Sequence, residues 1–240
     1  MHPLLSVVIP LYNEERRLMD GFTAIHSYLS SKPYPWEIIL VDDGSVDRTA
    51  EMLRNITVRY TNTRMTMNEQ NRGKGSAVKK GMLAAHGDII VFTDIDLSVP
   101  IAYIDAFVAK ISEGCDIAIG SRKIEGATLE IRQSPLREFM SRMFTRMSNL
   151  LLGIRFPDHT CGMKAFTKPA AHTLFSRLRT ERWAFDSEIL FLSKLLGYKV
   201  MEVAVLWRHM PGTKVRLFFD ALRSFWEIAK IRFYHTRTIR

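Results

Sequence analysis

Residues Ile38–Ser45 read IILVDDGS, an apolar run that ends abruptly in two carboxylates, a glycine and a serine. This pattern is typical of a buried strand followed by a tight turn, and we expect the strand to span Trp36–Val41. Similar short apolar runs occupy Leu4–Pro10 and Asp88–Thr93, and a segment with helical spacing, Glu14–Leu29, lies between two of them. Continuous apolar strands that alternate with helices predict an α/β fold, with a mostly parallel sheet covered by helices on both faces.

The same pattern continues along the chain. We expect further strands at Arg64–Asn68, Asp116–Ser121 and Val200–Leu206, and further helices at Asp47–Arg54, Ser76–Ala85, Pro100–Glu113, Ser134–Leu152, Ala184–Leu196 and Leu217–Phe233. Ser45 or Asp47 is the expected N-cap of the first of these helices. No internal repeat or flexible linker interrupts the chain, so we expect one domain over residues 1–212 and a separate amphipathic, basic segment over residues 213–240.

The composition of the 240 residues is that of a globular protein, with 47% apolar and 25% charged side chains, and it excludes extensive disorder. The two cysteines, Cys115 and Cys161, are far apart, which argues against a disulfide scaffold and fits a reducing compartment. No signal sequence is expected, and no apolar run approaches the roughly 18 residues of a membrane span. The absence of HExxH, GxSxG and GxxxxGK[ST] motifs excludes zincins, common serine hydrolases and P-loop NTPases.

Polar residues follow four expected strands or loops, at Pro10–Glu14, Asp42–Ser45, Asn71–Gly75 and Asp94–Asp96. Ligands of parallel sheets bind beyond the carboxyl ends of the strands, so four such ends together indicate a site. The Asn71–Gly75 loop could hold a diphosphate through its backbone N–H groups and a lysine. It is not a dinucleotide fingerprint, because a valine stands where the third glycine should be.

Asp94 and Asp96 follow directly after an apolar strand, at positions i and i+2. We expect both carboxylates to face the same side, where Mg²⁺ or Mn²⁺ would relieve their repulsion and bridge substrate phosphates. One helix cap plus one solvated turn residue is the structural alternative. A glycosidase-like acid–base pair is disfavoured, because those carboxylates face each other across the substrate.

Seven motifs occur in order: Val7–Glu14 (VVIPLYNE), Val41–Ser45 (VDDGS), Asn71–Ala77 (NRGKGSA), Thr93–Asp96 (TDID), Asp158–Lys164 (DHTCGMK), Glu181–Asp186 (ERWAFD) and Gly212–Arg216 (GTKVR). The first four resemble the inverting family 2 glycosyltransferases, which have the Rossmann-like GT-A fold. The last three resemble the polyprenyl-phosphate hexosyltransferases, in particular the dolichyl-phosphate β-glucosyltransferase branch. The resemblance covers nearly the whole chain and implies an enzyme that moves a hexose from a nucleotide sugar onto a polyprenyl phosphate.

The resemblance also implies roles for single residues. UDP-glucose would be the donor, with GDP-mannose as the alternative, and Asp94 and Asp96 would hold the donor diphosphate through Mg²⁺ or Mn²⁺. The residues that would bind the nucleotide or its sugar are Pro10, Tyr12, Glu14, Asp42, Asp43, Lys74, Trp183, Asp186, Glu188 and Lys214. Ser98 stands where mannosyl relatives often have a metal-ligating glutamine, so the implied ligand set stops at the two aspartates.

Arg122 and Arg137 match arginines that contact the acceptor phosphate in the family. A phosphate monoester is anionic near neutral pH and can attack the anomeric carbon directly, so positioning and charge relief matter more than a general base. Guanidinium groups suit this task because they bind phosphate bidentately. For Arg137, on the polar flank of a helix, a solvated surface arginine is the alternative.

Several single residues have a structural alternative. Trp183 could be a core residue, Asp158 and His159 could be metal ligands or part of a loop turn, and Cys161 is expected to be a buried, unreactive side chain.

The net charge of +9 lies entirely in two segments, residues 132–155 with +4 and residues 214–240 with +5. In both segments basic side chains flank an apolar helical stripe, as in helices that lie in a membrane interface. We therefore expect a peripheral protein on the cytoplasmic face of a membrane, although both helices could simply cover the sheet. A soluble or glycolipid acceptor remains an alternative. A basic nucleic-acid-binding module is disfavoured, because an aspartate pair without a metal repels phosphate.

Overall fold

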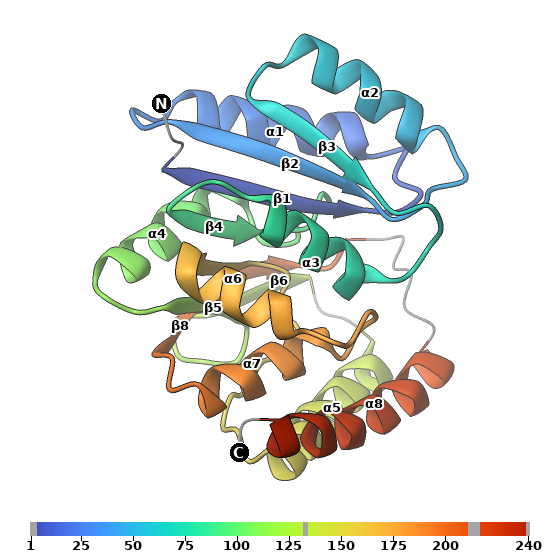
Figure 1. The fold of residues 1–240 in the computed structure, drawn as a ribbon, viewed down its shortest axis with the longest axis vertical. Helices are drawn as coiled ribbons and strands as arrows, with labels where there is room; N and C mark the ends of the chain where they lie inside the picture. The colour runs from blue at the N-terminus through green and yellow to red at the C-terminus, as the bar shows by residue number, and fades with distance from the viewer. Residues whose placement is uncertain (1–3, 132–133, 211–216, 239–240) are drawn as a thin grey trace.

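The computed structural model of the chain describes residues 4–131, 134–210 and 217–238. Its centre is a seven-stranded sheet in the order β3-β2-β1-β4-β7-β5-β8 (Figure 1). The strands are β1 (Leu5–Leu11), β2 (Trp36–Asp42), β3 (Thr63–Met67), β4 (Ile89–Phe92), β5 (Ile117–Ser121), β7 (Lys164–Thr167) and β8 (Val200–Ala204). All are parallel except β7, which runs antiparallel between β4 and β5, and this confirms the predicted mostly parallel sheet.

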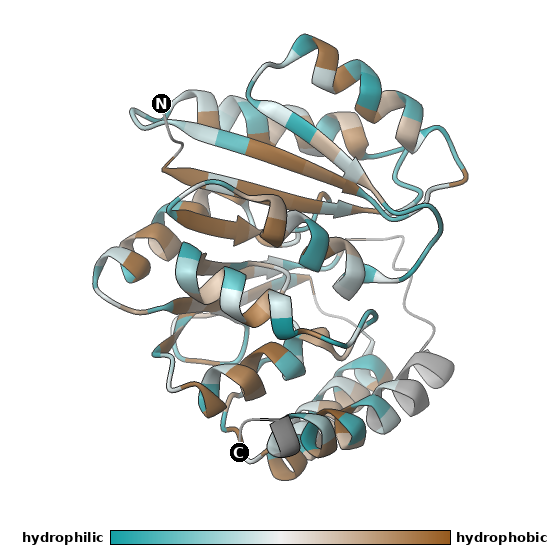
Figure 2. Cartoon of the chain, viewed as in Figure 1, coloured by the Kyte–Doolittle hydropathy of each residue, from teal (hydrophilic) through white to brown (hydrophobic). Residues whose placement is uncertain are grey.

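Helices cover both faces of the sheet, as the apolar strands require. One face packs against α1 (Leu18–Ser30), α2 (Thr49–Arg59) and α4 (Ile104–Ser112), with a short 3₁₀ turn, η1 (Ile101–Tyr103), before α4. The other face packs against α3 (Lys74–Ala84), α6 (Lys168–Arg177) and α7 (Phe185–Leu195). Figure 2 shows the central strands as the most apolar part of the chain.

The strands β1, β2 and β4 bring their carboxyl ends to one edge of the sheet. Leu11, the last residue of β1, lies beside Asp42, the last residue of β2, and Val8 of β1 lies beside Phe92, the last residue of β4. The polar residues that follow these strands therefore meet at this edge, as the sequence predicts.

Two features of the fold were not predicted: the segment that forms β7 and α6, and a second small sheet. The strand β7 has only four residues and contains one lysine, and it leads directly into α6, where the Thr167 hydroxyl accepts a hydrogen bond from Ala170 N as an N-cap. The expected strand Val200–Leu206 is wrong at its end, because the chain leaves β8 and forms a second small sheet from β9 (Leu206–Arg208) and β6 (Thr128–Ile131).

The helix α3 begins at Lys74, two residues before the expected start. The predicted Asn71–Gly75 loop therefore includes the first residues of this helix. The expected N-cap of α2 is wrong, because Arg48 occupies the N-cap position and makes no side-chain cap hydrogen bond. Asp47, one residue earlier, still accepts from Thr49 N through Oδ1 at 2.9 Å.

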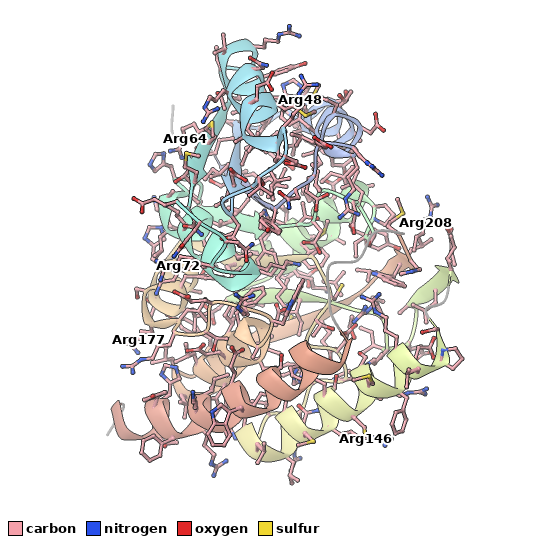
Figure 3. All side chains as sticks on the ribbon, turned by 90° about the vertical axis from the view of Figure 1, so that its right-hand side faces the viewer. Arg48, Arg64, Arg72, Arg146, Arg177 and Arg208 are labelled. Atoms are coloured by element: carbon pink, nitrogen blue, oxygen red, sulfur yellow. The ribbon has the colours of Figure 1, made fainter. Side chains whose placement is uncertain are left out.

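The helices α5 (Pro135–Leu152) and α8 (Leu217–Thr238) lie side by side at one end of the molecule (Figures 1 and 3). From α8, Ile228 and Ile231 are buried in the same apolar cluster as α7, so the C-terminal helix packs onto the domain. The expected boundary at residue 213 lies outside the described residues. Among the helices within residues 4–131, 134–210 and 217–238, none is both long and apolar enough to cross a membrane.

Candidate active site

Two lysine–aspartate pairs stand at the sheet edge. Lys74, the first residue of α3, places Nζ 2.6 Å from Oδ1 of Asp94, which follows β4. Lys164, on β7, places Nζ 2.7 Å from Oδ1 of Asp186 on α7, and both of these side chains are buried. Burial by itself would lower the pKa of Lys74, but the charges of Asp94, Asp186 and Asp96 outweigh it and raise the pKa. Lys74 therefore stays protonated beside Asp94.

Asp94 depends on a glycine of another motif. A Cβ atom placed on Gly162 would lie 2.4 Å from Oδ2 of Asp94, so any larger residue would push the carboxylate away. The loop that precedes β7 thus passes directly behind the first aspartate, and the glycine of the DHTCGMK motif makes the close approach possible.

Asp96 is oriented by its own turn. Its Oδ1 accepts hydrogen bonds from the backbone N–H of Ser98 at 2.9 Å and from the Ser98 hydroxyl at 2.8 Å. Its Oδ2 lies 3.9 Å from the guanidinium of Arg17. Ser98 therefore serves as a hydrogen-bond donor that fixes Asp96.

The aspartate pair fits a divalent cation. Within the described residues no group of three or more His, Cys, Asp or Glu side chains has metal-ligand geometry, so a fully protein-ligated site is absent there. Mg²⁺ needs no such cage, because it commonly takes one or two carboxylates and completes its shell with substrate phosphates and water. The two carboxylates are already oriented by this chain, Asp94 by Lys74 and Gly162, and Asp96 by Ser98 and Arg17.

Asp42, at the end of β2, carries an unsatisfied acceptor. It is buried, and its Oδ1 accepts from the backbone N–H and the hydroxyl of Ser45. Its Oδ2 has no hydrogen-bond partner among the described residues, although it is buried. A buried oxygen without a donor is costly, so this atom is suited to a ligand N–H or O–H group.

Asp43 shapes the neighbouring loop. Its carboxylate accepts from Asn68 Nδ2 at 2.7 Å, Asn71 Nδ2 at 2.9 Å, Arg72 N at 3.1 Å and Gly73 N at 2.7 Å. Burial raises the pKa of Asp43, and these hydrogen bonds partly oppose that rise. Four donors occupy the two carboxylate oxygens, so Asp43 holds the loop that carries Lys74, and its place near the nucleotide stays a prediction.

The residues after β1 form a second support. Pro10 belongs to β1, and Tyr12, which follows the strand, is half-buried. Glu14 is buried and pairs with Arg17, whose Nη2 lies 2.9 Å from Oε1, so the carboxylate of Glu14 is engaged by a neighbour. This pair holds Arg17 beside Asp96 and adds a positive charge to the sheet edge.

Arg122, predicted to meet the acceptor phosphate, is tied to a buried aspartate. Its Nε and Nη2 donate to the two oxygens of Asp158 at 2.7 and 2.8 Å, and its backbone N–H donates to the same carboxylate at 3.0 Å. Burial would raise the pKa of Asp158, but Arg122 lowers it to about 2. Asp158 lies in a loop, and its Oδ1 also accepts from the backbone N–H of Thr160 at 3.2 Å, so the expectation of a loop turn is confirmed. The alternative of a metal ligand is disfavoured, because Arg122 donates to both carboxylate oxygens.

Arg137, on α5, lies close enough to Arg122 for their charges to interact. Burial lowers the pKa of Arg137, and the positive charge of Arg122 lowers it further. The side chain is half-buried, so the alternative of a fully solvated surface arginine is wrong. Arg137 therefore adds positive charge near Arg122, whose own guanidinium is paired with Asp158.

His159 follows Asp158, the partner of Arg122, in the chain. It is buried, with Nε2 3.0 Å from Oδ1 of Asn149 on α5 and Nδ1 3.1 Å from the Ser187 hydroxyl on α7. Burial lowers the pKa of His159 to about 4, so the ring is neutral and connects two helices instead of binding a metal.

Trp183, Asp186 and Glu188, the three residues predicted to line the sugar pocket, lie in different surroundings. Asp186 lies in the lysine–aspartate cluster, as expected for a site residue, and Trp183 is half-buried in the segment before α7. Glu188 is fully buried and accepts from the backbone N–H groups of Arg179 and Thr180 and from His235. It therefore supports the backbone, and its place in a sugar pocket stays a prediction. Lys214 lies outside the described residues.

Cys161 is buried, as predicted, and burial raises the pKa of its thiol to about 11. A thiol with this pKa is a poor nucleophile at neutral pH. The residues that sequence reasoning missed are Arg17, which follows β1, and Gly162 and Lys164, which both belong to the DHTCGMK motif. The lysine inside the otherwise apolar β7 was the one available signal, since an unpaired buried lysine is rare.

Comparison with known proteins identifies a family over most of the chain. A family model described as Glycosyl transferase family 2 matches residues 6–175. A dolichyl-phosphate beta-glucosyltransferase of Dictyostelium discoideum is 34% identical over 241 residues, which cover 95% of this chain and 74% of that protein. Proteins of the same name from Saccharomyces cerevisiae and Homo sapiens are 33% and 32% identical, with the same two coverages of 95% and 74%.

Solved structures of similar fold include glucosyl-3-phosphoglycerate synthase from Mycobacterium tuberculosis. Its complex with Mn²⁺, UDP-glucose and phosphoglyceric acid aligns with a TM-score of 0.71 at 21% identity, covering 96% of this chain and 79% of that one. Its complex with Mg²⁺ and UDP aligns equally well. This likeness confirms the predicted Rossmann-like GT-A fold.

Proposed function

Because this chain belongs to glycosyl transferase family 2, we propose that it transfers glucose from UDP-glucose onto the phosphate of a polyprenyl phosphate, as the names of its relatives indicate for them. The structural observation that supports the proposal is that Arg122 lies close to Arg137 and also close to Asp186 of the lysine–aspartate cluster. The lysine–aspartate cluster suits the donor diphosphate, and the two arginines suit the acceptor phosphate.

The reaction needs little acid–base chemistry from the protein. An oxygen of the acceptor phosphate attacks the anomeric carbon of glucose, the bond from that carbon to the β-phosphate oxygen breaks, and UDP leaves with the electron pair. The configuration at the anomeric carbon therefore inverts. Arg122 and Arg137 would orient the attacking phosphate, and Lys74 would face the negative charge that develops on the leaving UDP.

Metal dependence is part of the proposal. Asp94 and Asp96 would hold Mg²⁺ or Mn²⁺, which when bound would neutralise the diphosphate of the donor. Arg17 and Lys74 flank the two aspartates and limit their mutual repulsion while the donor is absent. Asp42 would accept a hydrogen bond from the nucleoside through its buried Oδ2.

Membrane binding would bring the prenyl chain to the site. The large apolar side chains exposed on α5 and α8 are Leu136, Phe139, Met143, Leu150, Trp226, Phe233 and Tyr234. Exposed basic residues accompany them, among them Arg146, labelled on α5 in Figure 3, and Lys230 and Arg232 on α8. We propose that this end of the molecule lies on the cytoplasmic face of a membrane as a peripheral surface, with residues 213–240 contributing to it.

A donor and acceptor panel tests the proposed function. Labelled UDP-glucose and GDP-mannose are offered separately with a polyprenyl phosphate in detergent, and the product is partitioned between organic and aqueous phases. We expect transfer from UDP-glucose into the organic phase. Transfer only from GDP-mannose would contradict the proposed donor. Phosphoglyceric acid is offered as a second acceptor, and a product formed only with it, in the aqueous phase, would contradict the proposed acceptor.

A further inference from the structure

The last turns of α8 reach the back of the donor side. His235 on α8 is 4% exposed, and its Nε2 lies 2.6 Å from Oε1 of Glu188, which is fully buried in the first turn of α7. This contact joins two helices that are 47 residues apart in the chain. None of the proposed chemistry uses either residue.

Glu188 in turn holds a backbone segment. Its Oε1 accepts from the N–H of Arg179 at 2.9 Å, and its Oε2 accepts from the N–H of Thr180 at 2.7 Å. Burial would raise the pKa of Glu188, but its hydrogen bonds with His235 and with this backbone lower it. A carboxylate anchored by three donors fixes residues 179–181 relative to both α7 and α8.

Residues 179–181 pack tightly on the first turn of α3. The N–H of Ser76 donates to the carbonyl oxygen of Glu181 at 2.9 Å. A Cβ atom on Gly75 would lie 2.7 Å from the carbonyl oxygen of Thr180, and one on Gly73 would lie 2.6 Å from that of Glu181. With so little space, a shift of residues 179–181 would move this turn, which carries Lys74 and its contact with Asp94.

A cavity of about 230 Å³ lies between α8 and residues 179–182, and its lining includes His235 and Glu188 as well as Arg182, Glu227 and Lys230. The guanidinium of Arg179 also lies 5.1 Å from the centre of the Tyr234 ring. The hydrogen bond between His235 and Glu188 is thus a direct polar connection between α8 and α7 at the wall of this cavity.

We propose, on the basis of the function given above, that His235 is a positioning residue for the donor site. Its hydrogen bond to Glu188 fixes residues 179–181, and these residues fix the turn Gly73–Ser76 that presents Lys74 to the diphosphate. The C-terminal helix then supports the binding of a water-soluble nucleotide, in addition to any contact with a membrane.

The test measures UDP binding in detergent-free solution by titration calorimetry with Mn²⁺ present, on the full chain. His235→Met fills similar space without a donor, and His235→Gln keeps a donor at nearly the same position. We expect the Kd for UDP to rise about tenfold in His235→Met and to return close to the wild-type value in His235→Gln. In turnover assays the KM for UDP-glucose should rise in the same ratio, while the KM for polyprenyl phosphate stays unchanged.

Thr236→Ala is the matched control, because Thr236 is the exposed neighbour of His235 on the same helix. It should leave the Kd for UDP unchanged. An unchanged Kd in His235→Met would overturn the proposal, as would an equal rise in both KM values. If His235→Met does not fold, Glu188→Gln weakens the same bond from the other side and carries the test. Failure of the wild type to bind UDP would instead count against the proposed function.

Discussion

The donor side and the acceptor side of this molecule are built in different ways. On the donor side, Asp43 and Asp96 accept most of their hydrogen bonds from backbone and side-chain groups in the turns at the ends of strands. On the acceptor side, Arg122 is held by Asp158, which is 36 residues away, and His159 connects the helices α5 and α7. The donor side is thus shaped by turns at strand ends, and the acceptor side by long-range side-chain pairs between loops and helices.

This difference predicts which changes affect chemistry and which affect stability. Substitutions among the donor carboxylates should reduce activity with little loss of fold, because the turns that hold them are supported by many backbone contacts. Substitutions of the buried residues Asp158 and His159 on the acceptor side should also destabilise the protein. Each such change removes one partner of a buried pair and leaves the other unsatisfied.

The largest effect is expected on the donor side, for Asp96→Asn. The substitution removes a negative charge from the proposed cation site and should lower kcat/KM on the order of 10³-fold, with an unchanged melting temperature. Asp20→Asn, an exposed carboxylate on α1, is the control and should behave as wild type. Full wild-type activity in excess chelator would contradict the metal assignment on which this expectation rests.

The next effect concerns the acceptor side and acid stability. His159 has a pKa of about 4 in the folded chain against 6.5 for the free side chain, so the unfolded state binds a proton first as the pH falls. The contribution of His159 to the free energy of unfolding should therefore fall by about 3 kcal/mol between pH 6.5 and pH 4. Above pH 6.5 this contribution should not change with pH.

His159→Gln removes the titrating group and keeps hydrogen-bonding atoms for Asn149 and Ser187. Denaturant unfolding at pH 7 and pH 4.5 should show a smaller pH-dependent loss in this variant than in the wild type. Equal losses in both proteins would show that the buried histidine does not link the acceptor side to pH.

A smaller effect is expected for Arg122→Lys, which keeps the charge and loses the bidentate geometry. The KM for polyprenyl phosphate should rise by a factor that corresponds to about 2 kcal/mol, while the Kd for UDP stays the same. Arg48→Lys, at the exposed start of α2, serves as the control. A rise in the Kd for UDP alone would place Arg122 on the donor side and would remove the distinction between the two halves.

The smallest effect per residue is expected at the proposed membrane surface. Trp226→Ser, at a side chain that is 67% exposed, should weaken sedimentation with anionic liposomes by about 1–2 kcal/mol and leave UDP binding unchanged. Binding of the wild type should fall as salt rises, because basic residues attract the lipid surface. Wild-type protein that stays in the supernatant with anionic liposomes at low salt would contradict the proposed surface.

Local sequence was sufficient for most of the fold. Apolar runs such as Ile38–Val41 form strands because they bury both faces, and the polar residues after them must meet at one edge of a parallel sheet. The antiparallel β7 could not be predicted, because its four residues contain a lysine. That lysine is tolerated inside the sheet because Asp186, 22 residues away, pairs with it.

The sequence by itself determined the class of fold, the family, and the aspartates and the glycine-containing loop of the donor side, since these depend on strand ends and turns that neighbouring residues specify. Only the tertiary structure decided that Asp158 binds Arg122, that Gly162 makes room for Asp94, and that Glu188 supports a backbone segment. The physical reason is that these contacts join residues many positions apart, whose distances are set by how helices and loops pack on the sheet and by no local pattern.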